Sequence, residues 1–277
     1  MIAGMAARGA GKAEKSNRYS VIIERVFFAH YNEGDKTVAF SRDELIKTAQ
    51  SANIQVPKNL GDLIYSFRYR SELPVRIKKK APRGLEWIIR PSGKSLYKFV
   101  AVSQPHIQPN PALSMVKVPD ATPGIISMYA LNDEQALLAK IRYNRLIDIF
   151  TGIACYSLQS QLRTFVDDVG QVETDEIYVG IDKRGAHFVL PIQAKGSRDK
   201  ISVVQIEQDL AMCAQKFRGL VCRPLAAQFV QDNLIALFDI LESNHELRVA
   251  SEKHYMLVDP SELTEDELKQ YSSSSYE

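Results

Sequence analysis

A run of prolines divides this chain of 277 residues into two parts. The segment from Ser103 to Pro123 holds five prolines, each of which lacks a backbone N–H donor and restricts the residue before it. Such a segment interrupts helices and sheets, so we do not expect one continuous core across it. At about 100–200 residues per domain, the length also suits two domains. We therefore predict a linker over residues 103–123, between a first domain at 18–102 and a second at 124–260.

The two ends of the chain have the composition of flexible segments. Residues 1–17 are rich in Ala, Gly and Lys and lack the apolar centre of a signal peptide. Residues 261–277 combine acidic side chains with four consecutive serines, which predicts a short helix at most and then a disordered tail. The three cysteines are widely spaced, and no apolar run reaches the roughly 18 residues that cross a bilayer. We expect an intracellular, cytoplasmic protein without a membrane span.

Charge is distributed unequally between the two parts. Residues 1–110 carry 19 Lys and Arg against 9 Asp and Glu, whereas residues 111–277 carry 16 against 24. The net charge of +2 therefore combines a basic half of +10 with an acidic half of −8. This division suggests that one part meets a polyanion while the other performs chemistry that needs carboxylates. A surface charge that is merely uneven is the alternative.

Hydrophobic spacing predicts a helix, a strand and two further helices at the start of the first domain. Apolar side chains recur at helical spacing over residues 21–28, and residues 37–40 read as a strand. Ser41 and Glu44 have the spacing of a capping box, in which both side chains accept from free N–H groups at the start of a helix. Asn59 is placed to cap the third helix.

The rest of the first domain reads as a basic β-hairpin. After Pro74 the hydrophobic period changes to two, which predicts strands at 75–78 and 85–89 around a turn, and another strand at 96–100. This order of elements is that of a winged helix-turn-helix, whose third helix enters the major groove while the hairpin contacts phosphates. A small α+β domain that docks protein is the alternative. The expected DNA contacts are the basic residues of the third helix and the hairpin: Lys58, Arg68, Arg70, Lys78, Lys79, Lys80 and Arg83.

The second domain reads as a mixed β-sheet with helices packed on it, an α+β or α/β architecture. Asn132 or Asp133 can cap its first helix. The elements follow an αβββαβ order. In sequence they are a helix within 131–154, strands at 157–166, 171–181 and 186–195, a helix at 201–217, a strand at 219–223, a short helix at 225–229 and a final strand near 235–240.

Polar residues occupy positions in two of these strands where a buried sheet would favour Val or Ile. Because side chains alternate between faces along a strand, Glu173 and Asp175 share one face of their strand, and Glu176 lies on the opposite face. Gln193 and Lys195 share a face of the neighbouring strand. Burying such groups together is costly unless they have a function, although an exposed hairpin edge is the alternative. Asp175, the Gln193 side-chain oxygen and the Ala194 carbonyl are hard oxygen ligands that suit Mg²⁺. Lys195 can position or deprotonate an attacking water.

These residues carry a resemblance to a known family. Asp175, then Gln193-Ala194-Lys195 after a turn and a strand, then a helix with Gln205, resembles the PD-(D/E)XK nuclease superfamily in its Gln-x-Lys variant. The resemblance covers residues 130–240 and implies a restriction-endonuclease-like fold that hydrolyses DNA phosphodiester bonds with one or two Mg²⁺ ions. It also implies that the motif residues and Glu173 form the catalytic site.

The resemblance implies a role for one further residue, and the sequence departs from the family pattern at three positions. It implies that Arg198, in the loop after the motif lysine, meets the DNA strand that is cut. Gln193 stands where the family has a carboxylate, so Glu173 or Glu176 compensates or the metal binds less tightly. No proline precedes the motif aspartate, and Pro191 interrupts a predicted strand, which suggests a bulge or a sheet edge.

The sequence therefore predicts a Mg²⁺-dependent endodeoxyribonuclease of a bacterial or archaeal restriction system. A palindromic double-stranded DNA target would require a homodimer, since one site cuts one strand. Two other functions stay open. One is a DNA-binding regulator with an inactive nuclease-like domain, and the other is a recombination or repair nuclease that recognises DNA structure.

Overall fold

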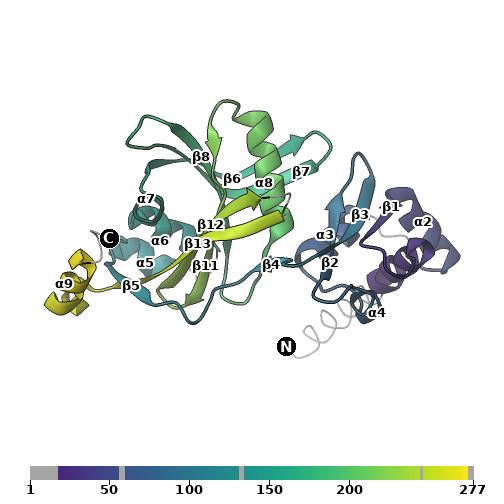
Figure 1. Ribbon diagram of the computed structural model, residues 1–277, viewed down its shortest axis with the longest axis horizontal. Helices are drawn as coiled ribbons and strands as arrows, with labels where there is room; N and C mark the ends of the chain where they lie inside the picture. The colour runs from purple at the N-terminus through teal and green to yellow at the C-terminus, as the bar shows by residue number, and fades with distance from the viewer. Residues whose placement is uncertain (1–17, 56–59, 131–133, 244–245, 274–277) are drawn as a thin grey trace, which may run out of the picture. The chain divides into compact units, whose positions relative to one another are not determined.

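The chain forms two compact units, which we describe separately (Figure 1). Unit 1 comprises Met1–Pro105 with Phe165–Gly170, and unit 2 comprises His106–Thr164 with Gln171–Glu277. In the described parts of these units, no helix is long and apolar enough to cross a membrane. The predicted arm at 1–17, Lys58, Asn59, Asn132 and Asp133 lie outside the described residues. The computed structural model describes residues 18–55, 60–130, 134–243 and 246–273.

The first elements of unit 1 follow the predicted order. The capping box is formed: the Glu44 N–H donates to the Ser41 hydroxyl over 3.3 Å, and the Ser41 N–H donates to the Glu44 carboxylate over 2.6 Å. Apolar side chains of all these elements form one core around Phe27 and Phe99. The elements are a helix over residues 18–30, β1 (Thr37–Ser41), α2 (Arg42–Ser51) and α3 (Leu60–Tyr69).

The predicted strand at 75–78 is wrong, because these residues form the short helix α4 (Val75–Lys78). A four-residue run cannot distinguish a strand from one helical turn, and here only Ile77 of the two apolar residues is buried. The hairpin of unit 1 is instead β2 (Glu86–Pro91) with β3 (Leu96–Val102), in an antiparallel sheet of order β1-β3-β2. The basic run that includes Lys78 therefore lies on α4 and the following loop, not at a hairpin tip.

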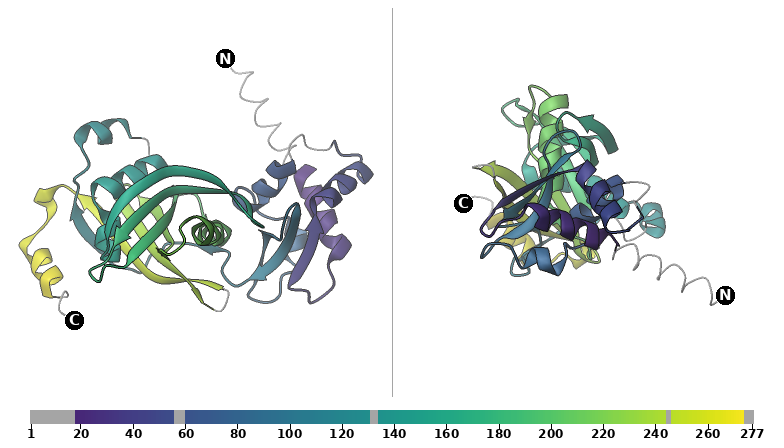
Figure 2. Two further views of the ribbon diagram at one scale, coloured as in Figure 1. Left: turned by 90° about the horizontal axis from the view of Figure 1, so that it is seen from above. Right: turned by 90° about the vertical axis from the view of Figure 1, so that its right-hand side faces the viewer.

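Unit 2 is built on a curled mixed sheet of order β5-β13-β12-β11-β8-β7-β6, with β10 also paired to β8 (Figure 1). Strands β7 and β8 are antiparallel, whereas β11 runs parallel to β8. Figure 2 shows the strands curving around α8 (Val203–Lys216), which is seen end-on. The strands are β5 (Met115–Pro119), β6 (Ala154–Val166), β7 (Gly170–Ile181), β8 (His187–Lys195), β10 (Val221–Cys222), β11 (Leu225–Gln231), β12 (Leu234–Ser243) and β13 (Glu246–Val258).

Helices cover both faces of this sheet. On one face, Leu137 of α6 (Glu134–Tyr143) and Leu146 of α7 (Leu146–Thr151) share a core with Ile192. On the other, Ile206 of α8 (Val203–Lys216) packs with Phe238. The predicted helix over 131–154 is interrupted between α6 and α7, where Arg145 has a left-handed φ of 48°. A further helix, α5 (Gly124–Tyr129), precedes α6.

The structure corrects three expectations about unit 2. The predicted linker contains β5 and also β4 (His106–Ile107), which pairs with β9 (Ile201–Ser202). The predicted short helix at 225–229 is part of β11, because this run is buried on both faces and its period carries no signal. Strand β13 follows the strand expected to be last.

Pro191 lies in a central strand, so the expected bulge or sheet edge is wrong. On the side of β8 away from β7, β10 pairs with residues up to Val189, and β11 pairs from Ile192 onward. Pro191 thus lies where the parallel neighbour changes. A missing N–H donor costs least at such a gap.

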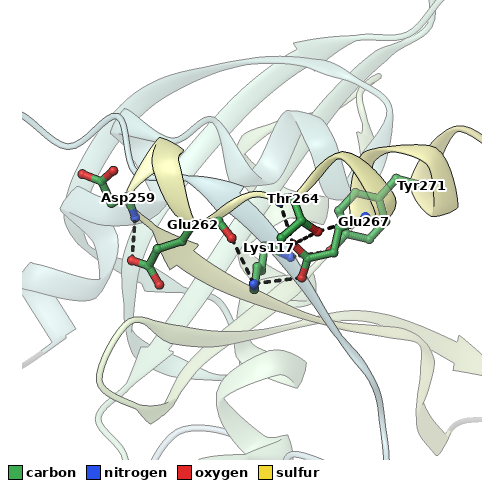
Figure 3. A network of polar contacts seen from close by, with 6 residues as sticks. All are labelled: Lys117, Asp259, Glu262, Thr264, Glu267 and Tyr271. Carbon is green, nitrogen blue, oxygen red and sulfur yellow. Dashed lines mark hydrogen bonds and ion pairs between the residues drawn. The ribbon is translucent and has the colours of Figure 1, made fainter.

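A short helix near the C-terminus, α9 (Glu265–Ser273), closes the edge of the sheet at β5 (Figure 3). The Lys117 ammonium donates to the Glu262 carbonyl over 3.2 Å and lies 2.8 Å from the Glu267 carboxylate. The Lys117 backbone N–H donates to the Tyr271 hydroxyl over 3.1 Å. An edge-strand donor that could pair with another chain is therefore satisfied by a side chain.

We predict that acid releases this helix. The hydrogen bond from Lys117, with those from Thr264, lowers the pKa of Glu267 to about 2, below its ordinary value of 4.5. A depressed pKa means that the contact stabilises the fold fully above pH 4.5 and is lost as the pH falls toward 2. The ring signals of Tyr271 in NMR spectra of tyrosine-labelled protein should shift within that window. Glu267→Gln should shift them already at neutral pH, whereas the exposed Glu265→Gln should not; identical spectra for both variants would contradict the prediction.

Candidate active site

The ladder between β7 and β8 ends at the predicted site. Paired residues run from Ile181 opposite His187 to Glu176 opposite Ile192, and no pair follows. Beyond this point the Ala194 N–H donates to the Asp175 carboxylate over 2.8 Å. A side chain thus replaces the missing backbone acceptor, and the two strands part with Asp175 between them.

Lys195 joins Asp175 at this opening. Its ammonium lies 3.8 Å from the Asp175 carboxylate and donates to the Ala194 carbonyl over 2.9 Å. The side chain of Lys195 is 17% exposed and that of Asp175 is 29% exposed, so both are shielded but reachable. The structure therefore brings together three of the predicted site residues: Asp175, Ala194 and Lys195.

The charge around Asp175 suits a cation. Burial raises the pKa of this carboxyl group above its ordinary value, the Lys195 charge opposes the rise, and the negative charges of Glu134 and Glu173 add to it. Glu134, at the start of α6, was not predicted, because only the fold brings it near β7. Arg163 of β6 lies beside Glu173, so three carboxylates and two cations leave one excess negative charge at the opening.

The donor set fits Mg²⁺ with few protein ligands. Among the residues that the structure describes, no cluster of three or more His, Cys, Asp or Glu side chains forms a complete metal site. Mg²⁺, however, usually keeps several waters and binds through one or two carboxylates. Asp175 and the Ala194 carbonyl provide hard oxygen atoms of this kind, so the two residues that would hold the ion are present.

Gln193 points away from this opening and toward α8. It is fully buried. Its amide nitrogen donates to Asp209 over 2.9 Å and to the Glu173 carbonyl over 3.1 Å. Its side-chain oxygen, predicted to bind Mg²⁺, accepts a hydrogen bond from the Gln205 amide over 3.1 Å. Gln193 and Gln205 therefore form a buried polar network beneath the site.

Asp209 is the centre of this network and was missed by the sequence analysis. It is fully buried, and the Thr174 hydroxyl donates to it over 2.6 Å. Burial raises the pKa of Asp209 to about 7, against the hydrogen bonds from Thr174 and Gln193. A signal was available in the sequence: Asp209 lies three residues after Ile206, on the buried face of α8.

The two glutamates expected to compensate for Gln193 take different places. Glu176 lies on the opposite face, as predicted, where it is fully buried, 2.7 Å from the Arg142 guanidinium. Glu173 is half-exposed and lies 3.4 Å from Arg163 of β6. Strict alternation would put Thr174 beside Glu176, but it reaches Asp209 on the other face, because regular pairing has already ended.

Of the basic residues predicted to contact DNA, some form ion pairs within the protein and others do not. Lys78 is paired with Glu72 over 2.6 Å, and Lys80 is paired with Glu33 over 2.7 Å. Lys79, Arg83 and Arg198 make no ion pair within the described residues. Arg198 is exposed in the loop after β8.

Arg68 on α3 and Arg70, which directly follows the helix, contact aromatic rings. The Arg70 guanidinium lies 4.8 Å from the Tyr65 ring centre, and that of Arg68 lies 5.1 Å from the Tyr69 ring centre. The Nε and Nη2 atoms of Arg68 are buried and make no hydrogen bond within the described part of the chain. These two atoms can donate to another molecule's acceptors only if the Arg68 side chain moves out of its buried position.

We predict that the cost of removing the Thr174 hydroxyl depends on pH. At pH 8 the Asp209 carboxyl group is mostly ionised, so Thr174→Val removes a charge-assisted hydrogen bond and should lower the free energy of unfolding by about 1.5–3 kcal/mol. At pH 5 the group is protonated, and the loss should fall to about 0.5–1.5 kcal/mol. Urea unfolding at both pH values measures this, with Thr174→Ser as the control that keeps the hydroxyl. An equal cost at both pH values would show that Asp209 does not titrate between them.

Comparison with known proteins leaves this site to be interpreted from its own geometry. Family models, curated proteins and solved structures give no match to this chain. The assignment of roles to Asp175, Lys195 and the residues around them therefore depends on their contacts, burial and charge.

Proposed function

We propose that this protein is a Mg²⁺-dependent endodeoxyribonuclease of the PD-(D/E)XK type. The observation that carries the proposal is the meeting of Asp175 and Lys195 at the point where β7 and β8 separate. An acid and an ammonium group held 3.8 Å apart at a partly exposed opening, with a backbone carbonyl beside them, suit phosphodiester hydrolysis.

The topology of unit 2 supports the proposal. Helices α6 and α7 precede the antiparallel β6, β7 and β8, and α8 then leads to β11, which is parallel to β8. This is the αβββαβ order that the hydrophobic pattern of the sequence predicted. Asp175 lies in the middle of β7, where the pairing of this strand with β8 stops, and Lys195 is the last residue of β8.

Each group at the opening has a role in the proposed reaction. Mg²⁺, when bound, would polarise the phosphate and lower the pKa of a bound water. Asp175, fixed by the Ala194 N–H, and the Ala194 carbonyl would hold the ion. The Lys195 ammonium would stabilise the negative charge that develops on the phosphate oxygens as water attacks the phosphorus in line.

Unit 1 supports recognition of double-stranded DNA by a winged helix-turn-helix. Its order of helix, β1, α2, α3 and the β2–β3 hairpin suits that fold. In this arrangement α3 enters the major groove, with Arg68 on the helix and Arg70 directly after it. The hairpin that acts as the wing carries Lys94 at its turn, and Arg90 lies directly opposite Lys98.

A second function, DNA binding without cleavage, is favoured by one observation. The polar atoms of Gln193, at the position of a family carboxylate, are all engaged in hydrogen bonds within the protein. Such a protein would bind DNA through unit 1 and use unit 2 for assembly. A sequence-specific double-strand cut, in contrast, would need a second copy of the chain.

Cleavage should depend on Lys195. We expect Lys195→Ala to lower the rate of Mg²⁺-dependent plasmid cleavage by about 10²–10³-fold, because it removes a charge that stabilises the transition state. Binding of a fluorescein-labelled duplex in EDTA should stay within about tenfold of wild type, since docking is unchanged. The control is Lys183→Ala, in the turn at the other end of β7 and β8. Full cleavage by the Lys195 variant would contradict the assignment of the catalytic site. Binding without cleavage by the wild-type protein would favour the second function.

DNA binding should depend on the unpaired cations of unit 1. Replacing Lys79 and Arg83 together with alanine should weaken duplex binding and reduce the slope of log Kd against log salt by about 0.9 for each phosphate that the variant no longer neutralises. Lys183→Ala combined with Lys269→Ala, both in unit 2, is the control that removes two positive charges elsewhere. The slope is measured by fluorescence anisotropy between about 50 and 200 mM salt. An unchanged slope would exclude these two side chains from the DNA interface.

A further inference from the structure

A short exposed loop connects the motif lysine to the rest of unit 2. Residues 196–200 leave β8 directly after Lys195 and lead into β9 and the start of α8. The four residues from Ser197 to Lys200 are exposed, and they include the cations Arg198 and Lys200 beside Asp199. Any DNA strand that lies over Lys195 would pass this loop.

The loop is held from below by one side chain of β11. Gln228 lies opposite Lys195 in the parallel β8–β11 register. Its amide nitrogen donates to the Gly196 carbonyl over 3.2 Å and to the Asp199 carbonyl over 2.7 Å. The Asp199 N–H in turn donates to the Gly196 carbonyl over 3.3 Å. Gln228 thus joins both ends of the loop to the central sheet.

Burying the Gln228 amide at this position costs free energy. Gln228 is 5% exposed, and its side-chain oxygen is buried without a hydrogen bond in the described part of the chain. Its neighbours on β11, Leu225 to Ala227 and Phe229, are buried and apolar. A half-satisfied buried amide is less stable than an apolar side chain at such a site, so stability alone does not explain Gln228. Its two N–H donors to the loop are what the position requires.

We propose that Gln228 is a positioning residue for the substrate and that the loop it holds binds a DNA backbone phosphate next to the one that is cleaved. The proposal rests on the proposed nuclease function. The ligand is a phosphodiester group, which the side chains of Arg198 and Lys200 would contact. Gln228 fixes the distance of these donors from Lys195. Without it the loop keeps its charges but loses its geometry.

The test removes the donors at nearly constant volume. Gln228→Met is compared with Gln231→Met, which changes an exposed amide at the end of the same strand. Limited trypsin digestion reports on the loop itself. Cleavage after Arg198 and Lys200 should be several-fold faster in the Gln228 variant and unchanged in the control. This readout needs no DNA and no catalytic activity.

Substrate measurements then test the phosphate role. Gln228→Met should raise KM for duplex cleavage about 3–10-fold with kcat within about twofold, and should lower the salt slope of binding by about one unit. Arg198→Ala with Lys200→Ala should produce the same changes, and adding Gln228→Met to that pair should have no further effect. Additive effects, or unchanged trypsin digestion, would overturn the proposal.

The outcomes separate this proposal from the function on which it rests. A wild-type protein that neither binds nor cleaves DNA overturns the proposed function together with the phosphate role. A wild-type protein that cleaves DNA, with a Gln228 variant of unchanged KM and salt slope, overturns the positioning role alone. If Gln228→Met does not fold, the Arg198 and Lys200 double variant still decides whether the loop contacts DNA.

Discussion

The hydrogen bond from the Ala194 amide to the Asp175 carboxylate determines how this sheet ends. Up to Glu176 opposite Ile192, backbone groups satisfy one another across β7 and β8. One residue further, a carboxylate takes over as the acceptor, and the strands diverge around it. The same divergence leaves Lys195 beside Asp175 and lets Thr174 reach α8. A buried N–H group must be paired. The Asp175 side chain pairs this N–H group where backbone pairing stops, and the two strands separate there to form the site.

Strand β8 contacts the helices on both sides of the sheet of unit 2. Ile192 and Ala194 pack in the core with α6 and α7, whereas Gln193 joins the buried network of α8. The edges of β8 also differ, since β7 is antiparallel and β11 parallel to it. The position of Lys195, at the end of this strand, therefore depends on the helices that pack on both faces of β8 and on both neighbouring strands.

Local patterns predicted those features that depend on neighbouring residues. The capping box of Ser41 and Glu44 formed because both partners lie in one turn, and the period of β7 and β8 identified these strands. The motif residues Asp175 and Lys195 met as expected. Features set by distant contacts were not predictable. Residues 225–229 have no periodicity that distinguishes helix from strand, and neither Glu134 beside Asp175 nor Gln228 beneath the loop carries a local signal.

The sheet order has a consequence for how unit 2 is made. Within the described residues, strand β5, at 115–119, joins the sheet only through β13, at 246–258, which also pairs with β12. During synthesis β5 therefore emerges well over a hundred residues before its partner, and β12 stays an open edge until β13 leaves the ribosome. Seven consecutive residues of β12, Leu234–Ile240, are buried in the finished fold, so an incomplete chain would expose an apolar strand that readily pairs with other chains. Pairing with β13 thus protects β12 from aggregation.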